Sequence, residues 1–212
     1  MSTQINQNKP NSLLKSSFVV GGMTFISRIS GFMRDIVFAN IFGASASTDA
    51  FFVAFKIPNF FRRLFAEGAF IQAFVPVLNE FKIKNPLQLK KFLSYIQGNL
   101  LIILIFVTVI GIIFSDTIIN IFAPGFSQTE NRHVIASEML QITFPYLLFI
   151  SLTALSAGIF NTFNRFLLPA ITPVVLNISL ITAALYFTQY FTTPIIALAY
   201  GVLAAGILQY AM

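Results

Sequence analysis

The sequence contains no cysteine, no tryptophan and a single histidine, His133. Without cysteine it forms no disulfide and offers no thiolate to a metal, and one histidine is too few for a typical zinc site. No glycine-rich phosphate loop of the P-loop type is present, so this chain has no means of hydrolysing nucleotides itself. The sequence therefore predicts no metal site and no cofactor, and it nominates no catalytic reaction.

Charge is also scarce, at 9% of 212 residues, whereas 57% of the residues are hydrophobic. The mean hydropathy is +0.82, which is too apolar for a soluble domain with its largely polar exterior. Several apolar runs reach the roughly 18 residues that a membrane-crossing helix needs. The ten-residue alternating segments of a transmembrane barrel are not found. These features predict an all-α integral membrane protein.

A polar N-terminus, residues 1–12, is expected to be disordered and cytoplasmic. Thr48 or Asp49 is expected to cap the second helix, with kinks at Pro58 and Pro76. The final apolar run has no polar flank, which favours an N-terminal piece of a longer protein. Turn and charge signals predict a six-helix transmembrane lobe over 13–212, with helices at 13–42, 48–81, 92–114, 134–160, 167–191 and 194–212.

The net charge of +6 could suggest a nucleic-acid partner in a soluble protein. Here lysine and arginine gather at the N-terminus and in the 82–91 and 161–165 connections, which six crossings would place on one side. The positive-inside rule explains this asymmetry and predicts a cytoplasmic N-terminus. No nucleic-acid partner is expected.

Residues 24–82 carry charge within apolar helices, unlike the other helical segments. At mid-membrane each ionisable group costs at least about 2.5–3.5 kcal/mol, so these side chains must pair, reach an interface or line a hydrated cavity. Pairing between the first two helices is one interpretation, and Glu67 could pair with Arg63 one turn earlier. The charged residues are Arg28, Arg34, Asp35, Asp49, Lys56, Arg62, Arg63 and Glu67.

The balance of these charges favours a second interpretation. Five cations stand against three anions, so a surplus of positive charge remains after pairing. Arginine suits phosphate because its planar guanidinium makes two parallel charge-assisted hydrogen bonds. A transporter for an anionic, phosphorylated amphiphile follows from the residues alone.

Several motifs closely resemble the MurJ (also MviN) lipid II flippase family of the multidrug/oligosaccharidyl-lipid/polysaccharide exporter superfamily. The match runs from about residue 13 to the end and is that of the N-terminal part of the family. The motifs occur in family order at family-like spacing. They are SRISGFMRD, FGASASTDAFFVAFKIPNFFRRLFAEGAFIQAFVPVL, FAPGF, ITFPYLLFISL and NTFNRF.

The resemblance implies about fourteen transmembrane helices in two pseudosymmetric lobes around a central cavity, of which this chain would be the first lobe. It implies a bacterial inner-membrane protein that exports lipid II, a polyprenyl-pyrophosphate-linked peptidoglycan precursor, by alternating access. The family's cavity residues correspond to Arg28, Arg34, Asp49 and Arg62. We expect the three arginines to bind the pyrophosphate, with Asp49 and Lys56 tuning the charge or gating of the cavity.

Straight-helix geometry does not bring these arginines together. Six residues advance 600°, so Arg34 points about 120° away from Arg28 unless Gly31 acts as a hinge. In the second helix the seven-residue spacing selects Arg63, whereas the resemblance selects Arg62. A change of register at Pro58 would reconcile the two.

Three alternatives remain open at this point. One is a related exporter of drugs or of another polyprenyl-linked glycan, which would share the architecture. Another is a membrane-embedded enzyme that acts on a polyprenyl phosphate. The third is a structural membrane subunit in which the charges only pair internally.

Overall fold

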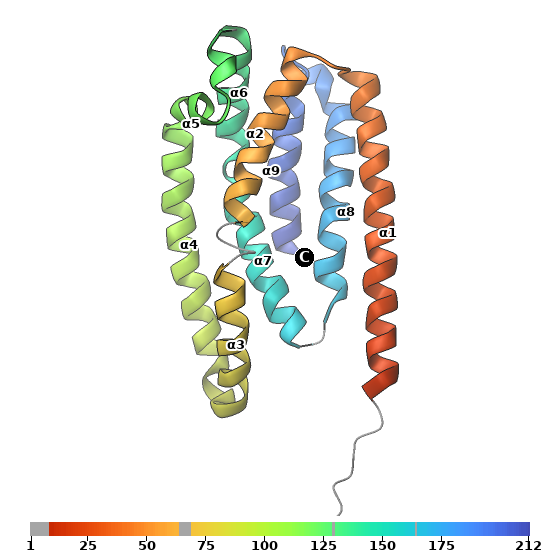
Figure 1. Ribbon diagram of the computed structural model, residues 1–212, viewed down its shortest axis with the longest axis vertical. Helices are drawn as coiled ribbons and strands as arrows, with labels where there is room; N and C mark the ends of the chain where they lie inside the picture. The colour runs from red at the N-terminus through yellow and green to blue at the C-terminus, as the bar shows by residue number, and fades with distance from the viewer. Residues whose placement is uncertain (1–8, 64–68, 129, 164) are drawn as a thin grey trace, which may run out of the picture.

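The computed structural model describes residues 9–63, 69–128, 130–163 and 165–212, and within these ranges every regular element is a helix (Figure 1). The predicted all-helical class is confirmed. The α-helices are α1 (Lys9–Ile41), α2 (Ala46–Arg62), α3 (Ala69–Lys84), α4 (Leu89–Ile113), α5 (Ser115–Phe122), α6 (Glu130–Thr143), α7 (Tyr146–Thr162), α8 (Leu167–Thr182) and α9 (Ile196–Ala211). The 3₁₀ or π-helical turns are η2 (Pro86–Gln88), η3 (Pro124–Gln128), η4 (Ala183–Phe187) and η5 (Thr188–Tyr190).

The cap of α2 differs from the expectation. Gly43 adopts a φ of 57°, a left-handed conformation that glycine tolerates, and this turns the chain directly after α1. Ser45 then caps α2 by accepting a hydrogen bond from the Thr48 backbone N–H at 3.2 Å. The expected cap at Thr48 or Asp49 is therefore wrong, because the early turn lets the helix begin at Ala46. Asp49 instead lies in the first turn.

The segments expected as single helices differ in what the structure describes. In the 48–81 range it describes α2 as far as Arg62 and α3 from Ala69. In the 134–160 range, α6 and α7 meet at Pro145 with a bend of 41°. Proline has no N–H to donate and its ring crowds the preceding turn, which explains the break. The connection after α4 also contains the short helix α5.

The main core lies where α2, α6, α7 and α9 meet. Phe51, Phe144, Tyr146 and Leu198 are almost wholly buried there. A buried polar contact joins α6 to α2, since the Thr143 hydroxyl donates to the Ala54 carbonyl at 3.2 Å. A smaller cluster packs α3 and α4 against the far end of α7.

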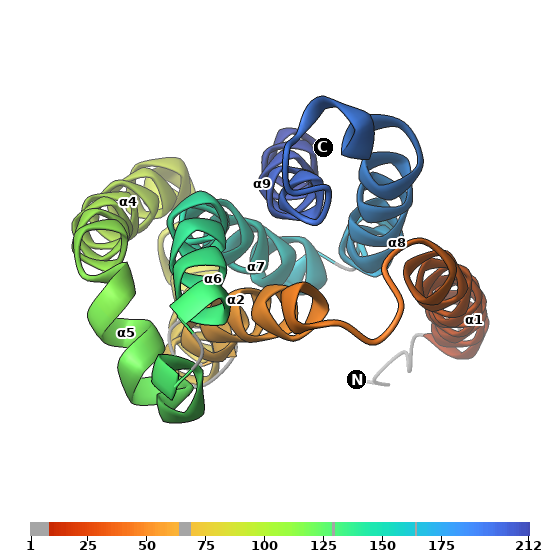
Figure 2. The ribbon, with the colours of Figure 1, turned by 90° about the horizontal axis from the view of Figure 1, so that it is seen from above.

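The helices form a bundle with α1 at one edge and α4 at the other (Figures 1 and 2). Helix α1 packs along α8, and α8 packs in turn against α9. Helix α2 lies in front of α7 and α9 in Figure 1 and contacts both. This arrangement places the charged helices α1 and α2 on the same face of the described part of the chain (Figure 2).

Two helical stretches of the described residues are long and apolar enough to cross a membrane, Pro86–Ile113 and Leu167–Tyr190. The bent pair formed by 131–143 and 146–162 counts as a third if it is one span. Helix α9 is apolar but shorter, and α1 and α2 carry charge. A lobe of six crossings stays a prediction.

Two glycines of α4 allow the packing to be tested. A Cβ at Gly111 would overlap the ring of Phe144, which is buried and has no room to move, whereas a Cβ at Gly98 would meet nothing within 4 Å. We expect Gly111→Ala to lower the free energy of unfolding by about 1–3 kcal/mol through overpacking. Gly98→Ala should raise it by up to about 1 kcal/mol because alanine favours the helix. Thermal unfolding of the full-length protein in detergent measures both, and equal melting temperatures for the two variants would contradict this packing.

Candidate functional site

The side chain of Arg34 is held between two partners on the face where α1 meets α8. Its Nη1 donates to the Asn177 Oδ1 at 2.9 Å. Its Nε and Nη2 donate to a single carboxylate oxygen of Asp35, at 3.0 and 2.7 Å. The arginine side chain is 24% exposed and that of Asp35 is 63% exposed. The guanidinium is thus fixed in place while its carboxylate partner faces the exterior.

Asn177 of α8 is the residue that sequence reasoning missed. It is 5% exposed, and its Nδ2 donates to the Ser30 Oγ at 2.9 Å and to the Ser27 carbonyl at 3.3 Å. One amide side chain therefore joins two points of α1 and orients Arg34. One feature of the sequence could have pointed to this residue, because Asn177 is the only residue with a side-chain amide in the otherwise apolar helix α8.

Gly31 lies opposite this asparagine. A Cβ there would stand 3.6 Å from the Asn177 Nδ2, which is ordinary contact. Helix α1 continues unbroken through Gly31, and α2 continues through the buried Pro58. Bending at Gly31 and a register change at Pro58 stay predictions.

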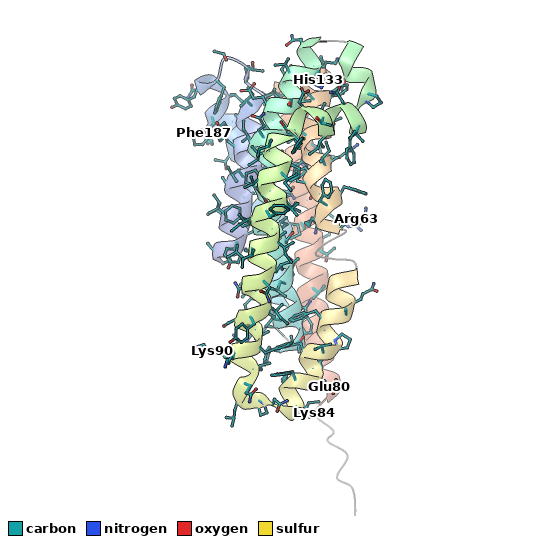
Figure 3. The ribbon with its side chains drawn as sticks, turned by 90° about the vertical axis from the view of Figure 1, so that its left-hand side faces the viewer. Arg63, Glu80, Lys84, Lys90, His133 and Phe187 are labelled. Atoms are coloured by element: carbon teal, nitrogen blue, oxygen red, sulfur yellow. The ribbon has the colours of Figure 1, made fainter. Side chains whose placement is uncertain are left out.

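Arg62 borders a cavity of about 280 Å³ among α2, α7 and α8. Thr153 and Asn161 of α7 and Pro173 of α8 contribute to its wall. Arg62 is half-buried, whereas the neighbouring Arg63 is exposed and points away from the bundle (Figure 3). Of the two arginines, Arg62 is thus the one at this cavity.

Helix α8 connects the two arginine sites. Pro173 lines the cavity of Arg62, and Asn177, one turn further along the same helix, holds Arg34. Residues four apart on a helix share nearly the same face. The fold therefore links Arg34 and Arg62 through a single short stretch of α8.

The remaining predicted residues are more exposed. Arg28 on α1 and Lys56 on α2 are both exposed. Asp35, which shares a face with Arg28 on a straight helix, bonds to Arg34 instead. The expected pairing of Glu67 with Arg63 lies outside the described residues.

Asp49 lies in the first turn of α2 and faces Arg132 of α6, with 3.8 Å between Oδ2 and Nη1. The two side chains are 58% and 38% exposed. His133, the next residue after Arg132, lies at the end of the molecule opposite Lys84 (Figure 3). The N-terminus of a helix also stabilises an anion. Asp49 is therefore placed at the end of the bundle where Arg132 and His133 lie.

The contacts of Arg34 with Asp35 fall short of the strongest geometry that an arginine offers to an anion. A guanidinium has five N–H donors. In Arg34 all three nitrogens, Nε, Nη1 and Nη2, donate a hydrogen bond. Both bonds to Asp35 end on one oxygen, so they lack the parallel geometry that makes an arginine pair strongest. An anion with two suitably spaced acceptor oxygens can form the parallel pair of bonds that Asp35 does not form.

Comparison with known proteins gives one consistent result. Residues 38–212 match the family model of the lipid II flippase MurJ. The chain is 48% identical over 199 residues to a probable lipid II flippase MurJ of Buchnera aphidicola subsp. Schizaphis graminum, covering 93% of this chain and 39% of that protein. It is 42% identical over 200 residues to the lipid II flippase MurJ of Burkholderia cenocepacia, covering 94% and 39%.

A solved structure agrees with the sequence matches. It is described as a lipid II flippase MurJ in an inward closed conformation, and it is 36% identical with a TM-score of 0.78. The alignment covers 92% of this chain and 40% of that one. The present chain thus spans about two fifths of the length of the relatives it matches. The extent and identity of these matches establish that the chain belongs to the lipid II flippase MurJ family.

Proposed function

We propose that the protein to which this chain contributes is a lipid II flippase, and that this segment supplies part of its substrate site. The substrate is a polyprenyl-pyrophosphate-linked peptidoglycan precursor, moved from the cytoplasmic to the periplasmic leaflet of the bacterial inner membrane by alternating access. The observation that carries the proposal is the pair of partly buried arginines, Arg34 and Arg62, joined through α8.

In this proposal the chain forms most of a six-helix N-terminal lobe, and a second lobe completes a central cavity. The cytoplasmic N-terminus follows from the basic residues near 82–91, where Lys84 and Lys90 lie at one end of the molecule (Figure 3). The exposed cations Arg28 and Lys56 belong to the same lobe and add to the positive potential of the cavity.

Binding would proceed by exchange of anions at Arg34. Asp35 pairs with the guanidinium of Arg34 when the substrate is absent, and its exposed carboxylate can rotate outward. The pyrophosphate then accepts hydrogen bonds from Arg34, which Asn177 keeps in position, and from Arg62 at the cavity. Removal from water strengthens both contacts because the local dielectric falls.

An exporter of another polyprenyl-linked glycan would share this architecture and differ only in its substrate. Measuring the binding of lipid II against that of other polyprenyl-linked glycans distinguishes the two functions. The family name is that of a transporter, and the described residues give no specific observation in favour of a catalytic reaction on the lipid.

We expect Arg34→Ala and Arg62→Ala to weaken binding of lipid II roughly ten- to hundred-fold. Each removes a charge-assisted hydrogen bond worth about 1.5–3 kcal/mol. Lipid II binding to the purified full-length protein measures the loss, and complementation of a flippase-depleted strain reports transport. Lys84→Ala is the matched control, because Lys84 is an exposed cation paired with Glu80 at 2.6 Å, at the end of the molecule opposite His133 (Figure 3). Equal binding by all three variants would refute the proposed site.

Asn177 is proposed to position Arg34 rather than to touch the substrate. Asn177→Ala should therefore weaken lipid II binding by about tenfold, through loss of one hydrogen bond to a charged group. Asn177→Asp should weaken it further, because a carboxylate would pair with Arg34 and compete with the pyrophosphate. The two variants are compared by lipid II titration at matched expression and melting temperature. Identical affinities for Asn177→Ala and Asn177→Asp would show that Asn177 does not act through Arg34.

A substitution at Asp49 tests whether this residue acts in transport or only stabilises the fold. Its ion pair with Arg132 is long and exposed, so Asp49→Asn should change the free energy of unfolding by less than about 1 kcal/mol. If Asp49 tunes gating, transport should fall while the melting temperature stays constant. Glu80→Gln, which removes a similarly exposed carboxylate from the Lys84 pair, should leave transport unchanged. Normal transport by Asp49→Asn would remove Asp49 from the functional site.

A further inference from the structure

A long apolar groove lies between α8 and α9, on a different face of α8 from the arginine site. Its volume is about 570 Å³, and it runs from Val175 and Leu208 at one end to Phe187 and Phe191 at the other. At 100° per residue, its α8 residues Val175, Ile178 and Ser179 lie about 100–200° around the helix from Asn177. Figure 2 shows α8 and α9 side by side, with α1 on the other side of α8. We call this feature the α8–α9 groove.

Small residues line the groove and let its two walls approach each other closely. Gly201 approaches Ala183 so closely that a Cβ on the glycine would stand 2.7 Å from the alanine Cβ. Ala197 and Ala204 continue the small surface along α9. The Ser179 hydroxyl donates to the Gly201 carbonyl at 2.8 Å, so this polar atom needs no ligand. The groove is thus lined mainly by apolar side chains, and a ligand in it does not have to form a hydrogen bond with Ser179.

The length and position of the groove match one leaflet of a bilayer. From Ala197 to Leu208 the helix rises about 16 Å, and half of a hydrocarbon core is about 15 Å. The α8 side belongs to Leu167–Tyr190, one of the stretches able to cross a membrane. Tyr186 and Tyr190, beside the Phe187 end, are 65% and 73% exposed, as expected for residues at the membrane–water interface.

The aromatic end of the groove faces outward. Phe191 and Tyr200 stack there with ring centroids 5.3 Å apart. Phe187 lies at the outer edge of the molecule, on the side away from Arg63 (Figure 3). The groove therefore runs from an aromatic interface region toward mid-membrane, and it opens away from the proposed substrate site.

We propose that the α8–α9 groove binds one acyl chain of a membrane phospholipid, with the headgroup at the Tyr186 and Tyr190 end. An apolar hollow does not hold water stably, and an empty one forfeits dispersion contacts along its walls. A single flexible hydrocarbon chain matches the length and the apolar lining of the groove.

The test uses native mass spectrometry of the full-length protein, purified in detergent after extraction from phospholipid membranes. Ala204→Phe fills the groove from its α9 wall and should retain one phospholipid fewer than the wild-type protein. Ile207→Phe is the matched control, because Ile207 lies on the same helix and is exposed but does not line the groove. It should retain the wild-type number. Equal phospholipid retention by all three proteins, or retention of a polyprenyl lipid instead, would overturn the proposal.

A second measurement keeps the proposal testable if Ala204→Phe does not fold. A photo-crosslinking amino acid at position 204 of the detergent-purified protein should form an adduct with phospholipid. The same amino acid at position 207 should form little, since loosely held lipid is washed away. A crosslink from position 204 to another segment of the protein would show that protein, and not lipid, covers the groove.

Discussion

The cost of placing charge in an apolar helix is the constraint on which this structure depends. A charge at mid-membrane is costly unless it is paired, hydrated or bound, and α1 meets this demand at Arg34 with two partners of different kinds. Asn177 holds the guanidinium from a neighbouring helix, and Asp35 neutralises it from the adjacent position. The neutral contact is buried and the charged one is exposed. Asn177 therefore fixes the position of Arg34, and the exposed Asp35 can be exchanged for another anion in our proposal.

Helix α8 serves two regions of the protein from two faces. One face presents Asn177 to α1 and, one turn earlier, contributes Pro173 to the cavity of Arg62, and another face forms a wall of the α8–α9 groove. In our proposals, the first face serves the anionic headgroup of the substrate and the second serves the surrounding lipid.

Composition and periodicity were sufficient to predict the all-helical fold, because apolar length and charge placement directly reflect the demands of a membrane. The motifs were sufficient to predict the family. The cap at Ser45 was not predictable, since it depends on the left-handed turn at Gly43. Asn177 was missed because its partners, Ser30 and Arg34, are about 145 positions away along the chain. The family resemblance selected Arg62, the arginine that borders the cavity, whereas helix spacing alone selected Arg63, because spacing carries no information on how α2 packs against α7.

The central claim is that Arg34 exchanges Asp35 for the substrate's pyrophosphate while Asn177 keeps it in place. The most direct test is a structure of the full-length protein with lipid II bound. Our account predicts pyrophosphate oxygens within hydrogen-bond distance of both Arg34 and Arg62, the Arg34–Asn177 bond intact and Asp35 released. A bound pyrophosphate that leaves Arg34 on Asp35, or that contacts neither arginine, would contradict it.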